Sequence, residues 1–311
     1  MKNIIEVSLD DVLTGKVSTF PILDSKLIVT TKLGLYNIKL VECGSYVQLY
    51  CYSEKKARTT GKDTSDLELR EYRMNKIFGV TTTQQHNTVN EEQPKVVEQR
   101  NIIRSKLECQ RLAKANMSDW KTFITLTFED TTKFDVTSVG DCNKRFRYFI
   151  DKVKRVYPEF KYICVPEFQK RGAVHYHLLT NIAIDNDKLI YKQSDNPRYS
   201  HIKYWIDGFT SVEKLKNEPK KVIGYIAKYM TKDIDQKLFN RHRYFYSRNL
   251  ITPSESYIDL DNPNDCEFLL KKIRGKEKIY SNQYINSFDG HDVEFQESVS
   301  YTHLDVYKRQ V

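Results

Sequence analysis

The sequence predicts an α+β protein built on a mostly antiparallel sheet with helices packed on it. Two β-rich stretches, FITLTF at 123–128 and KYICVPEF at 161–168, enclose a stretch whose apolar residues recur at helical spacing. The polar turn QKRG at 169–172 then leads into AVHYHLLTN at 173–181, which indicates a hairpin. A strand, a helix and a hairpin in this order are typical of an antiparallel sheet that carries helices.

Two helices are expected beside these strands. Pro219 begins the second of them at a favoured first-turn position, and this helix continues through KKVIGYIAKYMTKD. Asp141 is expected to cap the first helix, whose apolar residues follow one face: Phe146, Phe149, Ile150, Val153 and Tyr157.

Composition divides the chain into five parts. Residues 1–60 are β-rich, with Gly34 and Gly44 as expected turn points, and a capping box at Ser65 begins a helix that Gly79 ends. The expected parts are, in order, a β-rich N-terminal region of unknown role (1–80), a polar linker (81–97), the domain with the strands and helices above (98–253), a C-terminal extension (254–298) and a non-native tail (299–311).

The expected tail, VSYTHLDVYKRQV, continues no pattern that precedes it. It is similar to a peptide that adaptor sequence leaves at the ends of translated metagenomic reads. We therefore exclude these residues from the fold prediction, and we expect the native C-terminus to be missing.

The charge pattern favours a polyanionic partner without proving one. The chain carries a formal net charge of +9, and its 21 tyrosines outnumber its 15 phenylalanines. Aromatic rings stack on bases and cations meet phosphates, so this composition suits nucleic acid. A lysine-rich surface on a soluble protein explains the charge equally well. A basic, helix-like stretch at 98–116 has the same two interpretations, contact with DNA or a solvated face, and the solvated face is the default.

Cysteine use and hydropathy point to the cytoplasm. The six cysteines are scattered singly with no C-x-x-C pair, as free thiols are in a reducing cytosol, which argues against a zinc ribbon. The chain has no run of 18 apolar residues that could span a membrane, and its N-terminus lacks the apolar core of a signal peptide. We therefore expect no membrane partner.

Two histidines in the returning strand are the first candidates for chemistry. His175 and His177 are two residues apart, so both side chains point to one face of the strand while Tyr176 turns to the other, toward the core. Two imidazoles about 6–7 Å apart at the backbone can bind one cation together. Two surface histidines on an edge strand are the alternative, because an H-x-H pattern alone has little specificity.

Glu167 lies just before the turn and can strengthen this site. If the hairpin loop has an odd length, such as 170–172, Glu167 faces His175 across the pair and completes a three-ligand site with open positions. Two imidazoles and a carboxylate suit a divalent ion that must also accept a substrate oxygen. With an even loop, Glu167 points away as an ordinary solvated acid.

The second helix carries two phenols and two ammonium groups on one face. This face borders an apolar stripe made by Val222, Ile223, Ile226 and Met230. A lysine near a phenol favours the phenolate, which can attack phosphorus. Boundary tyrosines on an ordinary amphipathic helix are the alternative. The four polar residues fall at i, i+3, i+4 and i+7: Tyr225, Lys228, Tyr229 and Lys232.

The stretches FITLTF, GAVHYHLL and YIAKYMTK, in this order, resemble the three motifs of the HUH endonucleases. Within that superfamily they look most like rolling-circle replication initiators of plasmids and single-stranded DNA phages. RHRYFYSRNL at 241–250 is similar to a segment that follows the third motif in such proteins. The resemblance covers about 120–253. It implies a five-stranded antiparallel sheet with helices against one face, an RRM-like arrangement.

The resemblance also implies a metal-dependent, site-specific single-strand DNA endonuclease that rejoins strands in the cytoplasm of a bacterial host. It places His175 and His177 as ligands of Mg²⁺ or Mn²⁺, with Glu167 as the third ligand. Origin DNA, presented as a single strand, is the implied partner. Because the sequence has no Walker-type phosphate loop, a host helicase and a host polymerase are further expected partners.

The implied nucleophile is a tyrosine of a Y-x-x-K pattern, which gives a 5′-phosphotyrosine and a free 3′-OH. This sequence contains the pattern twice, as Tyr225 with Lys228 and as Tyr229 with Lys232. The tandem form is similar to the two-tyrosine initiators of small isometric phages, in which the tyrosines alternate. Many plasmid relatives use one tyrosine, so the choice between the two stays open.

Three other functions compete with this interpretation. A relaxase or a single-strand transposase of the same superfamily is the nearest, although relaxases usually carry a three-histidine site. A non-catalytic DNA- or RNA-binding protein, in which the histidines are incidental, belongs to a different class. A zinc-structured regulator is the third, and the lack of paired cysteines argues against it.

Overall fold

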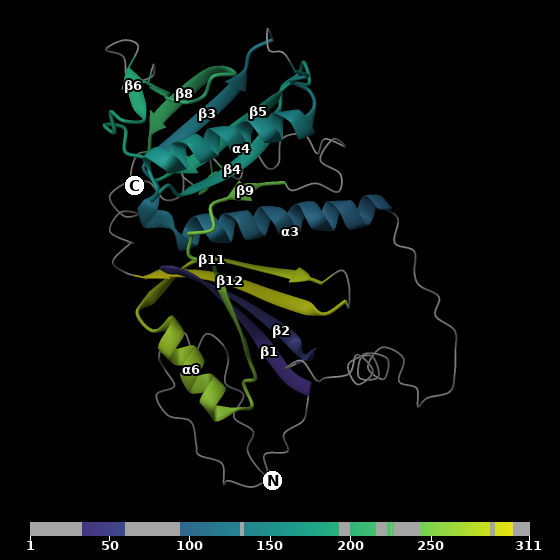
Figure 1. Cartoon of the computed structure of the whole chain (residues 1–311). Coiled ribbons are helices and arrows are strands. Elements are labelled where there is room, and N and C mark those ends of the chain that lie inside the picture. Colours follow the sequence, from purple (N-terminus) through teal and green to yellow (C-terminus); the bar gives the residue numbers. More distant parts are fainter. Residues whose placement is uncertain are drawn as a thin grey trace, which may run out of the picture. The chain divides into compact units, whose positions relative to one another are not determined.

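The computed structural model describes residues 33–59, 94–130, 134–192, 200–215, 223–224, 226, 243–286 and 290–300. The chain divides into two units, each with its own sheet (Figure 1). The central unit comprises residues 90–253, and the terminal unit joins residues 1–89 to residues 254–309.

The central unit is built on a seven-stranded sheet in which neighbouring strands are antiparallel. The strands predicted at 123–128, 161–168 and 173–181 correspond to β3, β4 and β5. The order across the sheet is β6-β7-β8-β3-β5-β4-β9. The bounds are Thr122–Phe128 for β3, Tyr162–Phe168 for β4, Val174–Thr180 for β5, Ile190–Lys192 for β6, Ser200–Ile202 for β7, Gly208–Lys214 for β8 and Phe245–Tyr246 for β9.

The α+β fold class is therefore confirmed, with two more strands in this sheet than the five that were expected. The edge strands β6 and β7 have three residues each, and β9 has two. Strands this short give the sequence no alternation to display, because a period of two needs at least four residues to be recognised.

Helix α4 (Val139–Val156) follows β3 and begins earlier than expected. Its N-cap is Ser138, whose hydroxyl accepts a hydrogen bond from the amide of Asp141 at 3.4 Å. The prediction of Asp141 as the cap was wrong. Serine and aspartate are comparably good caps, and Asp141 lies instead in the first turn, where its carboxylate interacts favourably with the helix dipole.

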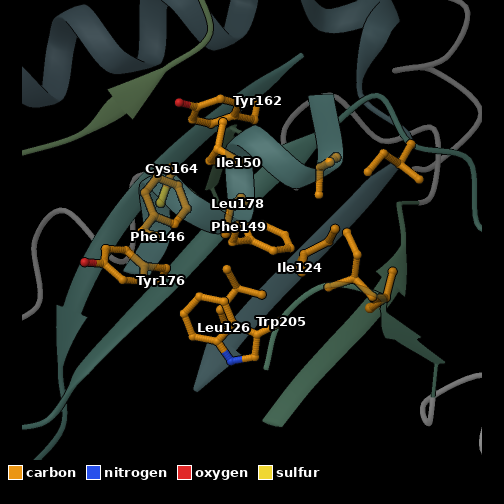
Figure 2. Close-up of a cluster of buried hydrophobic side chains, with 14 of the residues drawn as sticks. Ile124, Leu126, Phe146, Phe149, Ile150, Tyr162, Cys164, Tyr176, Leu178 and Trp205 are labelled. Carbon is orange, nitrogen blue, oxygen red and sulfur yellow. The ribbon is translucent and has the colours of Figure 1, made fainter. Parts of the chain in front are cut away.

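One face of the central sheet is closed by α4, which lies across β3, β5 and β4 (Figure 1). The ring of Phe146 on α4 stacks on Tyr176 of β5, with 4.6 Å between centroids, and Figure 2 shows the two rings side by side. Trp205 and Leu126 lie together in another part of the same cluster. The indole nitrogen of Trp205 donates to the carbonyl of Thr127 at 3.1 Å, so this core satisfies its polar group internally.

The opposite face of the sheet meets α3 (Pro94–Ala115) and the short 3-10 turn Met117–Asp119. Phe123 and Leu179 alternate along their strands with residues of the α4 core, so they point to this second face. Helical residues thus lie on both faces, where the resemblance implied helices on one. The buried residues here form what we call the α3 cluster: Cys109, Leu112, Ala113, Trp120, Phe123, Ile163, Val165, Leu179, Leu215, Ile226 and Leu250.

The terminal unit is a five-stranded antiparallel sheet with one described helix, α6 (Pro263–Ile273). Leu269 and Ile273 of α6 pack against Ile38, Leu40 and Leu49. The strand order is β10-β1-β2-β12-β11. The bounds are Leu33–Cys43 for β1, Tyr46–Thr59 for β2, Ser254–Ile258 for β10, Lys276–Ile285 for β11 and Asp292–Ser300 for β12.

Two glycines of the terminal unit test the predicted turns. Gly44, at φ 62°, lies in the turn between β1 and β2, as expected. Gly34 was also expected at a turn, and this was wrong, because it pairs with Arg58 inside β1. Val299 and Ser300, assigned above to the non-native tail, are the last two residues of β12.

Several predictions concern residues outside the described ranges. These are the helix expected at 65–79, the linker as far as residue 93, and residues 301–311. Of the helix expected from Pro219, only Ile223, Gly224 and Ile226 are described, and all three are helical. Within the described parts of the chain, no helix is long and apolar enough to cross a membrane.

Candidate metal site

The hairpin between β4 and β5 decides where Glu167 points. Residues 169–173 connect the strands, and the amide of Gln169 donates to the carbonyl of Ala173 at 2.9 Å. Gly172 adopts a φ of 86°, which this turn requires. With five residues in the loop, Glu167 lies directly opposite His175 in the register. This is the odd-loop alternative that the sequence left open.

Glu167, His175 and His177 come together on the face of the sheet opposite α4. Their ligand atoms all lie within 4.8 Å of one another, and they are the group of this kind found among the described residues. Oε2 of Glu167 and Nε2 of His177 are 2.6 Å apart, a hydrogen bond whose direction depends on the histidine tautomer. The two imidazole centroids are 6.2 Å apart.

His177 is held from two sides. Its ring stacks on Phe123 of β3 with 5.8 Å between centroids and 15° between planes. Its Nδ1 lies 3.2 Å from Oγ1 of Thr125, the residue directly opposite in β3. Only 4% of His177 is exposed. Both ring nitrogens therefore have defined neighbours, and the ring orientation is fixed before any ligand arrives.

His175 presents a nitrogen that lacks a partner. Its Nε2 is buried and makes no hydrogen bond in the described structure. Burial lowers the pKa of His175; the neighbouring Glu167 acts in the opposite direction, and Arg171 adds to the lowering. A lowered pKa keeps the imidazole neutral near pH 7, which is the form that binds a metal ion.

These residues fit a divalent cation. A buried nitrogen without a hydrogen bond costs free energy unless something fills its lone pair or accepts its proton. A cation between His175, His177 and Glu167 satisfies that nitrogen and uses the adjacent carboxylate for charge balance. Two imidazoles and one carboxylate leave coordination positions open, as a metal that must also accept a substrate oxygen requires.

Arg171 brings a positive charge to the same hairpin. Its guanidinium donates to Oε1 of Gln169 at 2.7 Å and to the carbonyl of Phe128 at 3.1 Å, and it pairs with Asp130. These contacts connect the hairpin turn to the end of β3. Neither Arg171 nor Thr125 was singled out from the sequence, because each depends on a cross-strand neighbour that only the register reveals.

Tyr176, between the two histidines, faces the other way. It is fully buried in the α4 core, and its hydroxyl donates to Oδ1 of Asn143 at 2.6 Å. Burial raises its pKa well above the usual tyrosine value. Tyr246 does share the histidine face, but it pairs with Ile163, four residues or about 13 Å along β4 from Glu167. Neither tyrosine is placed to act at the cluster.

The expected nucleophile helix lies almost entirely outside the described residues. Tyr225, Lys228, Tyr229 and Lys232 are all among the residues that are left out, so their positions relative to the histidines are not described. Ile226, between the two tyrosines, is fully buried in the α3 cluster with Phe123 and Val165. It thereby lies on the face of the sheet that carries His177.

The central unit contains a match to a known family. Residues 121–234 match the model of a family described as replication-associated protein, of the ORF2 type. The matched stretch contains β3, the Glu167–His175 hairpin and the helix expected from Pro219. The match supports a Rep-type initiator of DNA replication, a class that binds DNA. No curated protein and no solved structure matches the chain.

Proposed function

We propose that this protein starts rolling-circle replication by nicking one strand of origin DNA. In this proposal His175, His177 and Glu167 hold a divalent metal ion, and a tyrosine between residues 225 and 229 is the nucleophile. The observation that carries it is the buried, unpartnered Nε2 of His175 beside a carboxylate and a second imidazole, within the stretch that matches the Rep family.

Mg²⁺ or Mn²⁺ suits the three ligands. Carboxylate oxygen binds both ions, and the two imidazoles lean toward Mn²⁺. When bound, the ion supplies positive charge and polarisation at a phosphoryl oxygen. The protein contributes position: Phe123 and Thr125 hold the ring of His177, and the hairpin register holds Glu167 opposite His175.

Tyr225 or Tyr229 performs the cleavage in this proposal. The phenolic oxygen attacks phosphorus in line, so a bond forms to the tyrosine while the bond to the 3′ oxygen breaks. The phenol loses its proton and the departing 3′ oxygen gains one, which leaves a 5′-phosphotyrosine and a 3′-OH. Lys228 and Lys232 favour the phenolate and neutralise phosphate charge. The burial of Ile226 beside Phe123 supports a tyrosine segment on the histidine face.

The covalent intermediate also explains strand joining. A phosphotyrosine retains the free energy of the phosphodiester bond, so a free 3′-OH can attack it and reseal the strand without ATP. Two tyrosines allow a second cut while the first remains linked to DNA. The free 3′ end left by the first cut is the primer for a host polymerase, and unwinding falls to a host helicase.

The test is adduct formation by the full chain on a pool of end-labelled single-stranded oligonucleotides, with Mg²⁺, with Mn²⁺ and with EDTA. We expect a metal-dependent covalent adduct, and mass spectrometry of the DNA-linked peptide to find Tyr225 or Tyr229. If the tyrosines are interchangeable, Tyr225→Phe and Tyr229→Phe each retain the adduct and the double variant loses it.

Two results contradict the proposal. An adduct that persists in the Tyr225→Phe/Tyr229→Phe variant places the nucleophile elsewhere. DNA binding by the wild type without cleavage under any of the metal conditions identifies a non-catalytic binding protein instead.

A further inference from the structure

We propose that Phe209, on β8, is a stacking platform for the base of a nucleotide next to the scissile phosphate. This inference rests on the proposed function, because it names the surface that positions the single strand. It concerns a residue outside the three motifs, on the strand that follows the hairpin in the chain.

Phe209 is the large apolar side chain of β8 that solvent reaches most. It is 63% exposed, whereas Val212 on the same strand is fully buried in the α4 core. Because side chains alternate along a strand, Phe209, three residues from Val212, points to the opposite face. That face carries His175 and His177. An exposed phenylalanine costs hydration free energy, so its position calls for a partner that covers the ring.

The register places Phe209 in line with the metal site. Thr127 of β3 lies opposite Phe209 on one side and opposite His175 on the other. Glu167 continues the same row on β4. Neighbouring strands are 4.7–4.9 Å apart, so the backbones of Phe209 and His175 are about 10 Å apart. A phosphate held at the histidines therefore brings the base of a neighbouring nucleotide within reach of the ring.

Gly208 fixes the strand that presents this ring. Its φ is 152°, and a Cβ built there would lie 2.2 Å from the carbonyl oxygen of Thr127 and 2.6 Å from the amide of Glu129. The backbone of β8 thus begins in closer contact with the end of β3 than any other residue type permits. The position of Phe209 in the row with His175 follows from this close approach.

A second aromatic pair extends the same face beyond β8. Ile190 and Ile202 are buried in the α4 core, so their neighbours Tyr191 and His201 point to the histidine face. The rings of Tyr191 and His201 stack with 5.4 Å between centroids, and Tyr191 is 47% exposed. Exposed rings on successive strands are the feature that single-stranded DNA uses, because every base has a face that can stack.

The alternative occupant of this ring is an apolar protein surface. Tyr204 and Ile206, in the loop before β8, are also exposed and would enlarge an apolar patch. The row shared with His175 and Glu167 favours DNA, because only a strand bound at the metal site has to pass over Phe209. A protein partner predicts no link between the ring and the position of a base relative to the cut.

The experiment measures KM and kcat for cleavage by the full chain of the oligonucleotide that the wild type cuts best. Phe209→Ala should raise KM by about 5- to 150-fold, as loss of one base stack does, with kcat changed less than about twofold. Phe209→Trp should restore KM. The matched control is Phe268→Ala, which removes an exposed phenylalanine of α6 in the terminal unit and should change neither constant.

A set of substrates, each lacking one base, locates the contact. For the wild type, one abasic position within a few nucleotides of the cut should raise KM as much as Phe209→Ala does. That abasic substrate should show no further loss with Phe209→Ala, because the same stack is already absent. The melting temperature of Phe209→Ala should equal that of the wild type, since the ring is exposed.

Failure of this inference is distinguishable from failure of the proposed function. If the wild type cleaves and Phe209→Ala leaves KM unchanged, or if the abasic and Phe209→Ala effects simply add, the stacking platform is refuted while the nicking function stands. If the wild type cleaves no single-stranded substrate with Mg²⁺ or Mn²⁺, the proposed function fails and the inference fails with it.

Discussion

Adjacent residues of β5 separate two faces of one sheet. On the α4 face, Tyr176 is fully buried, its ring stacks on Phe146 and its hydroxyl has a hydrogen-bond acceptor (Figure 2). On the other face, His177 shares a hydrogen bond with Glu167, and Nε2 of His175 is buried without a partner in the described structure. One face satisfies its polar atoms internally, and the other leaves one unsatisfied.

This difference separates what the strand does for stability from what it does for chemistry. A core that satisfies its own polar groups contributes to folding, and an unsatisfied buried nitrogen persists where a ligand compensates for it. Substitutions on the α4 face should therefore lower stability, and those on the histidine face should lower activity. The predictions below test this separation, from the largest expected effect to the smallest.

The largest effect is expected from His175→Ala combined with His177→Ala. Nicking of single-stranded DNA should fall at least about 100-fold, because loss of the metal removes several kcal/mol of transition-state stabilisation. DNA binding, measured by fluorescence anisotropy in EDTA, should stay within about threefold of the wild type, since phosphate contacts provide most of it. Equal losses of binding and nicking would mean that the histidines are structural.

Tyr176→Ala should have the opposite profile. Removing a fully buried aromatic ring should lower the free energy of unfolding by about 3–5 kcal/mol. Urea unfolding followed by tryptophan fluorescence measures this in the right place, because Trp120 and Trp205, the only two tryptophans, both lie in the central unit. Tyr246→Ala is the control, because its side chain is 47% exposed and its removal should cost less than about 1 kcal/mol. A loss below about 1 kcal/mol for Tyr176→Ala would contradict the assignment of this face to the core.

The alternation that separates these residues was readable from the sequence. An H-x-H pattern in a strand places both imidazoles on one face and the central tyrosine on the other, whatever the rest of the fold is. The partnership with Glu167 was only half readable. It depended on the length of the hairpin loop, and the five-residue connection became visible only once the register was known.

Contacts between distant segments could not be read in this way. Thr125 meets His177 because β3 pairs with β5 across some fifty residues, and no local pattern in either segment reports that pairing. The terminal unit is a larger case, since β2 pairs with β12 from the far end of the chain. Periodicity predicts elements, and the choice of partner is decided by packing over the whole unit.

Gly208→Ala should destabilise the strand that carries Phe209. The added methyl would collide with the backbone of Thr127, so we expect a loss of about 1–3 kcal/mol in the tryptophan-monitored unfolding of the central unit. Gly140→Ala is the matched control, because a Cβ there meets only Oγ of Ser138 at 3.9 Å in the first turn of α4. That variant should be neutral or stabilising by up to about 1 kcal/mol. Similar losses in the two variants would show that the close approach of β8 to β3 contributes nothing.

Thr125→Val should have the smallest effect and the most selective one. The substitution keeps the shape of the side chain and removes the oxygen that lies 3.2 Å from Nδ1 of His177. A ligand histidine that loses the partner of its other nitrogen typically binds metal 10–100-fold more weakly. Because the Thr125 contact is long and the Phe123 stack remains, we expect the low end of that range, about a tenfold rise in the Mn²⁺ concentration for half-maximal nicking.

Saturating Mn²⁺ provides the decisive readout for Thr125→Val. A positioning residue acts through metal affinity, so the maximal rate of nicking should return to within about twofold of the wild type when the ion is in excess. Thr127→Val is the control, because Thr127 lies opposite His175 in the same strand and no hydrogen bond joins its hydroxyl to either histidine among the described contacts. If Thr125→Val lowers the maximal rate with no change in the Mn²⁺ requirement, Thr125 influences the histidine face by a route other than the orientation of His177.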